Sequence, residues 1–272
     1  KYRVLVPWLA DIIQRLSGVS IPTAFILVNI FATLLTGLGF TAYLNYELGF
    51  AKMLALLGGL LSITCVSITR TLPFPMLEPM SFLASLMVFW SLRRKNPWLF
   101  AAASIFAIAT KEVFVFATPL YWVLNIDWSE KLSRKNLLAF LIGFIPLVIF
   151  ISIRVALGGH PFEVEFGHNP LEGSIPSQFK KLFYWDGNLH YWGGLLVAFG
   201  VMWAGVIKFN RDKFTLKSAL VAIPLVMLAA LFFSGRISRV VGILYPIIIP
   251  SFLWLLTSLT SIESDRAENR AP

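Results

Sequence analysis

Cysteine, charge and the motifs of soluble enzymes are scarce in this chain of 272 residues. Its single cysteine, Cys65, lies in an apolar run and excludes a disulfide within the chain. Charged residues make up 14%, against about 25% in soluble globular domains. No P-loop, dinucleotide fingerprint, HExxH or GxSxG motif occurs. These absences argue against a soluble enzyme that depends on a nucleotide or zinc cofactor.

Apolar and aromatic residues are abundant instead. Hydrophobic residues make up 57%, with 24 Phe and 9 Trp, and the mean hydropathy is +0.76. This composition predicts an integral membrane protein with many aromatics at the lipid surface and the interfaces. The net charge of +9 comes from short basic clusters between apolar runs, which is typical of a topology signal. We therefore expect membrane lipid, and no nucleic acid, as a partner.

Apolar runs of spanning length predict an all-α, polytopic transmembrane bundle in a single domain, 1–272. A span needs roughly 20 residues, and candidate runs occupy 22–44, 51–69, 78–92, 136–154, 191–208, 215–233 and 240–260. Segment 97–126 is too short for two spans and carries Lys111 and Glu112 near its centre, so we expect two short helices in a hairpin. Residues 1–18 predict an interfacial amphipathic helix, and the bundle proper covers 22–260.

Three basic clusters orient the bundle by the positive-inside rule. They are Arg93–Lys95, the 131–135 stretch and the 208–217 stretch, and we expect all three in the cytoplasm with the tail 261–272. The N-terminal helix and the long polar loop 155–190 then lie outside. The remaining charges also fall toward the outer side, where a shared water-filled cavity would explain them: Arg70, Glu78, Lys111, Glu112, Arg154, Arg236 and Arg239.

The Lys111-Glu112 pair is the most unusual feature, because intramembrane charge is expensive and usually functional. Lys111 would pair with an anionic group of a ligand at the floor of that cavity. The competing interpretation is a structural pair at a helix junction that neutralises itself or a neighbour. The sequence favours neither interpretation.

Other charges have a functional and a structural interpretation too. Arg236 and Arg239 lie three apart at the start of a helix, where guanidinium groups would bind phosphate or simply anchor to lipid headgroups. Glu78 precedes Pro79 at a helix start and is favoured there by the helix dipole, which is a sufficient structural reason for it. The three histidines match no zinc spacing, so no metal site is predicted.

Three segments resemble the GT-C superfamily of polytopic glycosyltransferases, which use polyprenyl-phosphate-linked sugars. "LEPMSFLASLMVFWSLRRKNPWLFAAASIFAIATKEVFVFATPLYWVL" is similar to the family's acidic-Pro helix start, basic loop and short helices around a TKE stretch. "SGRISRVVGILYPIIIP" resembles its late Arg-plus-Pro helix, and "YRVLVPWLADII" an early outer segment of bacterial members. Each segment is short, and together they are distributed along most of the chain, from residue 2 to residue 250.

The resemblance implies sugar transfer from a polyprenyl-phosphate donor to an acceptor at the outer face of the bacterial inner membrane. Lys111, Arg236 and Arg239 would contact the donor phosphate, with Arg70 as a further candidate. The family's catalytic Asp follows its first transmembrane helix, a region that here would mostly precede Lys1. Asp11 is the only early outer Asp, and Glu78 and Glu112 are the other weak candidates for the base. The resemblance implies no cofactor other than a divalent cation.

Two further functional classes compete with the transferase. A non-catalytic subunit or scaffold of a larger membrane complex would use the same fold after losing its base, and would have membrane-protein partners. A transporter would predict inverted repeats and broken helices in corresponding halves. Only one interrupted segment and no internal repeat occur, so the transporter ranks last.

Overall fold

A computed structural model describes residues 4–64, 78–127, 129, 133–158, 199–208, 212–233 and 241–268. These residues form helices and turns and contain no strand, which confirms the all-α prediction. The principal helices are α1 (Leu5–Ser17), α2 (Ile21–Ala42), α3 (Lys52–Thr64), α5 (Glu78–Arg93), α6 (Pro97–Thr110), α7 (Ala117–Asn125), α8 (Arg134–Gly143), α9 (Ile145–Ala156), α12 (Trp203–Lys208), α13 (Lys213–Phe233) and α15 (Tyr245–Glu268).

Within the described ranges, three helical stretches are long and apolar enough to cross a bilayer: Ile21–Glu47, Arg134–Ala156 and Gly242–Thr260. The first joins α2 to a π-helical turn, Tyr43–Glu47, and the second joins α8 to α9. Large apolar side chains on these helices are exposed, including Phe31 at 63% and Leu141 at 57%. Such surface is unfavourable in water and favourable against lipid, so it supports a membrane protein.

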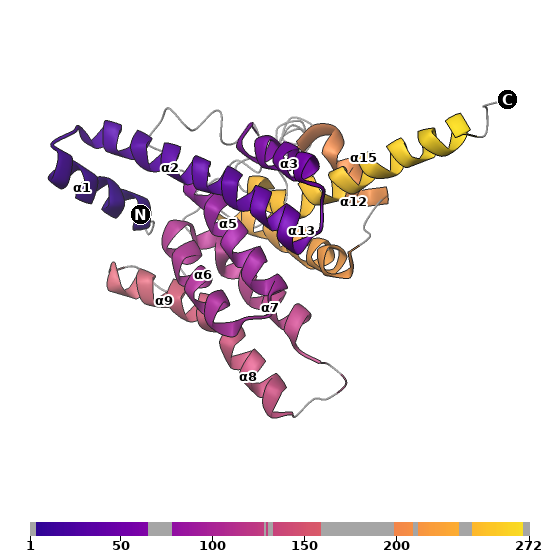
Figure 1. Ribbon diagram of the computed structural model, residues 1–272. Coiled ribbons are helices and arrows are strands. Elements are labelled where there is room, and N and C mark those ends of the chain that lie inside the picture. The colour runs from indigo at the N-terminus through magenta and orange to yellow at the C-terminus, as the bar shows by residue number, and fades with distance from the viewer. Residues whose placement is uncertain are drawn as a thin grey trace, which may run out of the picture.

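Two of the expected spans, 51–69 and 191–208, are described only in part. Run 51–69 begins as α3, which the structure describes as far as Thr64, and run 78–92 becomes the 16-residue α5. Of run 191–208 the structure describes residues 199–208, and the last helix continues beyond 260 to Glu268. Helix α5 is apolar and buried on nearly all sides, because it packs between α2 and α6 (Figure 1). A helix that is hydrophobic all round is a core element, which explains why α5 is not a lipid-facing span.

The predicted hairpin at 97–126 is present. Helix α6 ends at Thr110, and Lys111 is extended, with φ −158° and ψ 129°. A 3₁₀ turn, Glu112–Phe116, then leads into α7. The rings of Phe100 and Tyr121 lie 4.2 Å apart, so the end of α7 returns to the start of α6.

An aromatic core holds α2, α5 and α15 together. Tyr245 is fully buried, with its ring 5.0 Å from Phe82 and 4.8 Å from Phe40. Its hydroxyl donates to the Phe82 carbonyl at 3.1 Å, which satisfies the only polar group of the side chain. Residues from three distant parts of the sequence thereby fix the position of α5.

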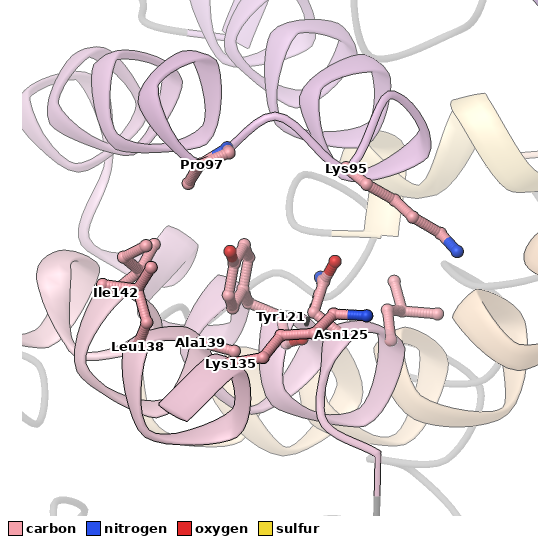
Figure 2. Close-up of a pocket in the computed structure, with 9 residues that line it drawn as sticks. Lys95, Pro97, Tyr121, Asn125, Lys135, Leu138, Ala139 and Ile142 are labelled. Atoms are coloured by element: carbon pink, nitrogen blue, oxygen red, sulfur yellow. Dashed lines mark hydrogen bonds between the residues drawn. The ribbon is translucent and has the colours of Figure 1, made fainter. Parts of the chain in front are cut away.

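The basic loops gather at one end of the bundle, as the predicted topology requires. Arg93 forms an ion pair with Asp212 and so joins the first and third loops. Lys95 and Lys135 line one cavity of about 200 Å³, which joins the first and second loops (Figure 2). We call this end, formed by residues 93–95, 133–135 and 212–217, the basic end. Helix α5 leads from it to Glu78 at the opposite end.

Candidate functional site

The structure brings Lys111 and Glu78 together at the end of the bundle opposite the basic end. Lys111 Nζ lies 3.8 Å from Glu78 Oε1, and the two side chains are 5% and 1% exposed. The two residues are 33 positions apart in the sequence and meet because α5 packs along α6. Lys111 therefore forms an ion pair with Glu78, which belongs to another helix.

Local structure favours both charges where they lie. Glu78 is the first residue of α5, and Lys111 is the C-cap of α6. A negative charge at a helix N-terminus and a positive charge at a C-terminus are each stabilised by the helix dipole. Pro79 occupies the second position of α5, where its missing N–H removes no helical hydrogen bond. The pair thus sits where two helix ends of opposite polarity meet.

Burial makes this pair energetically conspicuous. Taking two charges out of water costs several kcal/mol per ion, and their attraction offsets this only in part. Apolar residues of similar volume are often equally stabilising at such a position. Packing alone therefore gives no reason for the chain to keep Lys111 and Glu78 charged, and this is what makes them candidates for function.

The other carboxylate candidates lie differently. Glu112 is half-buried and begins the 3₁₀ turn next to Lys111. Asp11 pairs with Arg15 one turn along α1, with 3.0 Å between Oδ2 and Nη2, on a face that is largely exposed. The buried face of α1 consists of Val6 and Ala10. Asp11 is thus engaged on the outer face of its own helix.

Helix α1 nevertheless begins beside the pair. The backbone N–H of Val4 donates to the Ala109 carbonyl at 3.2 Å, two residues before Lys111. Val6 packs in a small cluster with Val28, Ala32 and Met80, which lies two residues after Glu78. The start of α1 therefore covers one side of the site.

Arg70, Arg236 and Arg239 lie outside the described residues, as do the histidines of the loop 155–190. The chain is described again from Val241, which is buried. The Ser85 hydroxyl of α5 donates to the Ile243 carbonyl. Ser85 is seven residues, or roughly 10 Å, along α5 from Glu78.

One buried cation was not singled out by the sequence. Arg154 in the last turn of α9 is 3% exposed, and its guanidinium lies 4.5 Å from the centre of the Phe150 ring. A cation held over an aromatic face is stabilised by the ring quadrupole. The signal in the sequence was a single arginine ending the apolar run 136–154, which we interpreted only as an outward charge.

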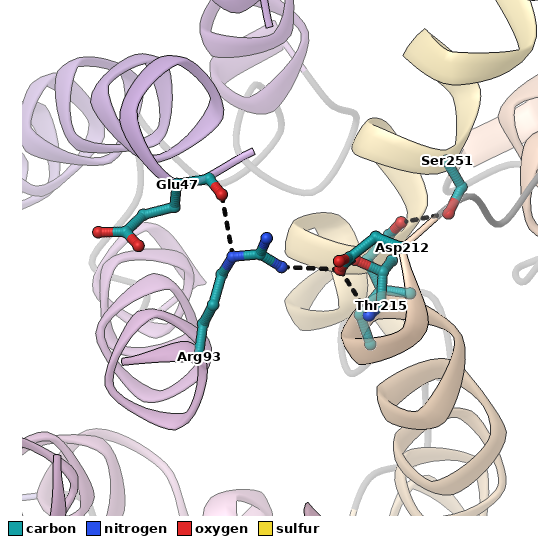
Figure 3. A network of polar contacts seen from close by, with 6 residues as sticks. Glu47, Arg93, Asp212, Thr215 and Ser251 are labelled. Carbon is teal, nitrogen blue, oxygen red and sulfur yellow. Dashed lines mark hydrogen bonds and ion pairs between the residues drawn. The ribbon is translucent and has the colours of Figure 1, made fainter. Parts of the chain in front are cut away.

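A network at the basic end was missed altogether. Arg93 donates from Nε to the Glu47 carbonyl at 3.1 Å and from Nη1 to Asp212 Oδ2 at 2.7 Å (Figure 3). The Glu47 carboxylate accepts from Trp90 and from Arg94, at 2.8 and 2.7 Å. The sequence showed these arginines only as a topology signal, because their acidic partners are distant in the chain.

Asp212 links this network to a helix start. Its carboxylate accepts hydrogen bonds from the backbone N–H and the hydroxyl of Thr215, at 2.9 and 2.8 Å, and so caps α13. Burial raises the pKa of Asp212, but the hydrogen bonds from Arg93 and Thr215 outweigh burial and leave that pKa below its ordinary value. Asp212 therefore stays ionised at neutral pH and has a structural role.

Metal chemistry has no visible support in the described part of the chain. There, no group of three His, Cys, Asp or Glu residues lies close enough to hold an ion. Comparison of the chain with protein-family models, curated proteins and solved structures finds no match.

Proposed function

We propose that this protein is a GT-C-like membrane glycosyltransferase, which moves a sugar from a polyprenyl-phosphate carrier to an acceptor at the outer face of a bacterial inner membrane. The single observation that supports it is the buried Lys111–Glu78 pair, held at a helix break opposite the basic end. Such a pair is expensive, and transfer from a lipid phosphate has a use for it.

The chemistry needs a cation and a carboxylate. As the bond between the anomeric carbon and the carrier phosphate breaks, negative charge grows on the phosphate, and a fixed ammonium stabilises it. Lys111 would supply this charge, with Arg70, Arg236 and Arg239 as further contacts. The acceptor hydroxyl loses its proton to a base, for which Glu78 is the best placed of the three candidates, because it lies beside Lys111.

The topology is compatible with a reaction at the outer face. Three basic loops at one end favour a cytoplasmic location for that end. Glu78 and Lys111 then lie in the outer half of the bilayer, where a carrier phosphate from the outer leaflet would meet them. A multi-pass topology with more spans than the three long helices is part of this proposal.

A non-catalytic subunit of a larger membrane complex is the second candidate. It is favoured by the contact between Lys111 and Glu78 itself, since the two charges already neutralise each other within the protein and need no substrate. In that case the pair would fix how α5 and α6 meet, and partner proteins would bind the lipid-facing surface.

Sugar transfer by the full-length protein separates the two functions. Radiolabelled polyprenyl-phosphate sugars are supplied as a panel of donors, and transfer by wild type is compared with Lys111→Met and Lys111→Arg. We expect the rate of sugar transfer to fall at least roughly a hundredfold in Lys111→Met, because one group that stabilises the developing phosphate charge is removed. Lys111→Arg should restore part of that rate. Lys213→Gln, an exposed change at the basic end, is the matched control.

Two results would count against the transferase. Wild type inactive with every donor would favour the scaffold. Activity that is unchanged in Lys111→Met would refute the role of Lys111, whatever the enzyme's other residues do.

A further inference from the structure

The cavity at the basic end has no part in the proposed reaction. It lies between the loop that joins α5 to α6 and the α7–α8 corner. Its polar lining comes from Lys95, Lys135, Asn125 and Tyr121. Figure 2 shows Tyr121 and Asn125 pointing toward the space below Pro97, with Lys95 on the upper wall and Lys135 on the lower wall and both ammonium groups toward the same edge of the space. Two cations and two neutral hydrogen-bonding groups thus converge on one space.

The remaining lining is apolar and continues onto a lipid-facing surface. Leu138 and Ile142 of α8 line the cavity. Their helix is part of the candidate span Arg134–Ala156, and its neighbouring side chains Leu137 and Leu141 are 61% and 57% exposed. A ligand with an anionic head and an acyl chain matches this combination of surfaces.

Lys95 has a backbone conformation that a lysine rarely adopts. Its φ is +51°, in the left-handed region, just after α5 ends. Glycine or asparagine is usual at such a position, and another residue there costs of order 1 kcal/mol. Backbone stability therefore favours Gly over Lys at position 95, so the presence of a lysine there needs a reason other than the stability of the turn.

Lys135 is also unfavourably placed for its own helix. It is the second residue of α8, which has no acidic residue in its first turn. The positive end of a helix dipole disfavours a cation there. The positive-inside rule explains why basic residues lie at this end of the bundle, but it does not explain why they occupy positions 95 and 135.

The wall that carries Lys135 is held in place. The Asn136 side chain donates to the Asp127 carbonyl at 2.6 Å and accepts from the Asp127 N–H at 3.0 Å, which ties the end of α7 to the start of α8. The Asp127 carboxylate interacts electrostatically with Lys135. It also accepts hydrogen bonds from the backbone amide and the hydroxyl of Ser129, at 3.1 and 2.6 Å. A preformed wall lowers the entropic cost of binding.

We infer that this cavity binds the phosphate headgroup of an anionic membrane lipid at the basic end, with Lys95 and Lys135 as its cationic ligands. At about 200 Å³ it is smaller than the roughly 300–1,000 Å³ of sites that enclose a drug-sized molecule. It therefore seats the headgroup alone, and an acyl chain lies outside along α8. Basic pockets between helices on the cytoplasmic side are a known setting for such lipids.

Lipid-dependent thermal stabilisation of the purified full-length protein in detergent tests this inference. Dioleoyl phosphatidylglycerol is titrated against wild type, Lys95→Gly, Lys135→Gln and the double variant, with dioleoyl phosphatidylcholine as the neutral lipid. The double Lys213→Gln/Lys217→Gln variant is the matched control, since it removes the same charge from exposed positions of the same end that do not line the cavity.

We expect phosphatidylglycerol to bind roughly fivefold more weakly to each single cavity variant and roughly thirtyfold more weakly to the double variant, while the control stays close to wild type. Without lipid, Lys95→Gly should melt at or above the wild-type temperature, because the left-handed backbone suits glycine. Weaker lipid binding by a protein that is no less stable cannot be explained by misfolding. The Lys95→Arg/Lys135→Arg variant should retain binding.

Other outcomes overturn the inference. Equal weakening in the cavity and control variants would show a general charge effect without a site. Stabilisation of wild type by soluble glycerol phosphate as strongly as by the lipid, lost in the cavity variants, would assign the cavity to a soluble phosphate compound. No preference for phosphatidylglycerol over phosphatidylcholine would refute the anionic headgroup.

Discussion

Neutralising the Lys111–Glu78 pair one residue at a time, and then both together, provides the sharpest test of its role. The charged atoms lie 3.8 Å apart and are almost completely buried. At an effective dielectric constant of about 20, this distance corresponds to an attraction of about 4 kcal/mol. Removal of one partner of a buried pair typically costs about 3–5 kcal/mol, because the charge of the other partner then stays buried without compensation.

We expect Lys111→Met and Glu78→Met each to destabilise the protein by about 3–5 kcal/mol, and the double variant to lie within about 1 kcal/mol of wild type. Methionine has a similar length, fills irregular gaps and carries no charge. Reversible unfolding in mixed micelles, followed by tryptophan fluorescence, gives the four free energies and the coupling between the two positions.

The double variant also separates stability from function. If the pair only packs α5 on α6, the double variant should retain whatever activity or complex assembly wild type has. If Lys111 serves a lipid phosphate, the double variant should fold and still be inactive. Additive single effects would refute the reasoning, since two residues that interact at 3.8 Å must couple.

Three further predictions concern the frame around the site. Asp212→Asn should keep the α13 cap but lose the Arg93 ion pair and the acid sensitivity that comes with it. The pKa of Asp212 is lower in the folded protein than in the unfolded chain. The ionised Asp212 therefore stabilises the fold at any pH above the unfolded-state pKa, and this stabilisation is lost as the pH falls through the folded-state pKa. Melting temperatures measured across acidic pH test this, since Asp212→Asn should remove this part of the acid sensitivity. Gly205→Ala should lower the melting temperature by an amount equivalent to about 1–3 kcal/mol, since the new methyl would lie 2.5 Å from backbone atoms of α15. In a cysteine-free background, membrane-impermeant maleimide applied to whole cells should label Ser17→Cys and leave Lys213→Cys unlabelled until the cells are opened; the reverse pattern would overturn the orientation.

The hairpin could be predicted from the sequence because its signal is local. Residues 97–126 are too few for two spans, and Lys111 interrupts them, so a break at that point was the simplest interpretation. The direction of the chain through three basic loops also placed Glu78 at the same end as Lys111. The distance between the two could not be predicted, because it depends on how α5 packs against α6.

Contacts between distant polar residues were the part that the sequence concealed. Arg93 looked like one member of a basic cluster, yet it bonds Glu47 and Asp212, which are 46 and 119 positions away. The surroundings of each apolar run were concealed for a related reason. Apolar runs give the same signal whether a helix faces lipid or protein, and α5 faces protein on nearly every side.

The length of α5 sets the depth of the candidate site. Its 16 residues rise about 22 Å from Arg93 to Glu78, whereas the hydrocarbon core of a bilayer is about 30 Å thick. If the Arg93 network lies at the cytoplasmic edge of that core, Glu78 and Lys111 lie about 8 Å below its outer edge, and any tilt of α5 places them deeper. A carrier phosphate can reach Lys111 only if the outer face is recessed there or the bilayer is locally thinned. Under the transferase proposal such a recess must admit both the lipid phosphate and a hydrophilic acceptor, whereas under the scaffold proposal the pair can stay sealed. Water access at Lys111, measured by the reactivity of a Lys111→Cys variant toward a small charged thiol reagent, therefore distinguishes the two proposals independently of any assay of sugar transfer.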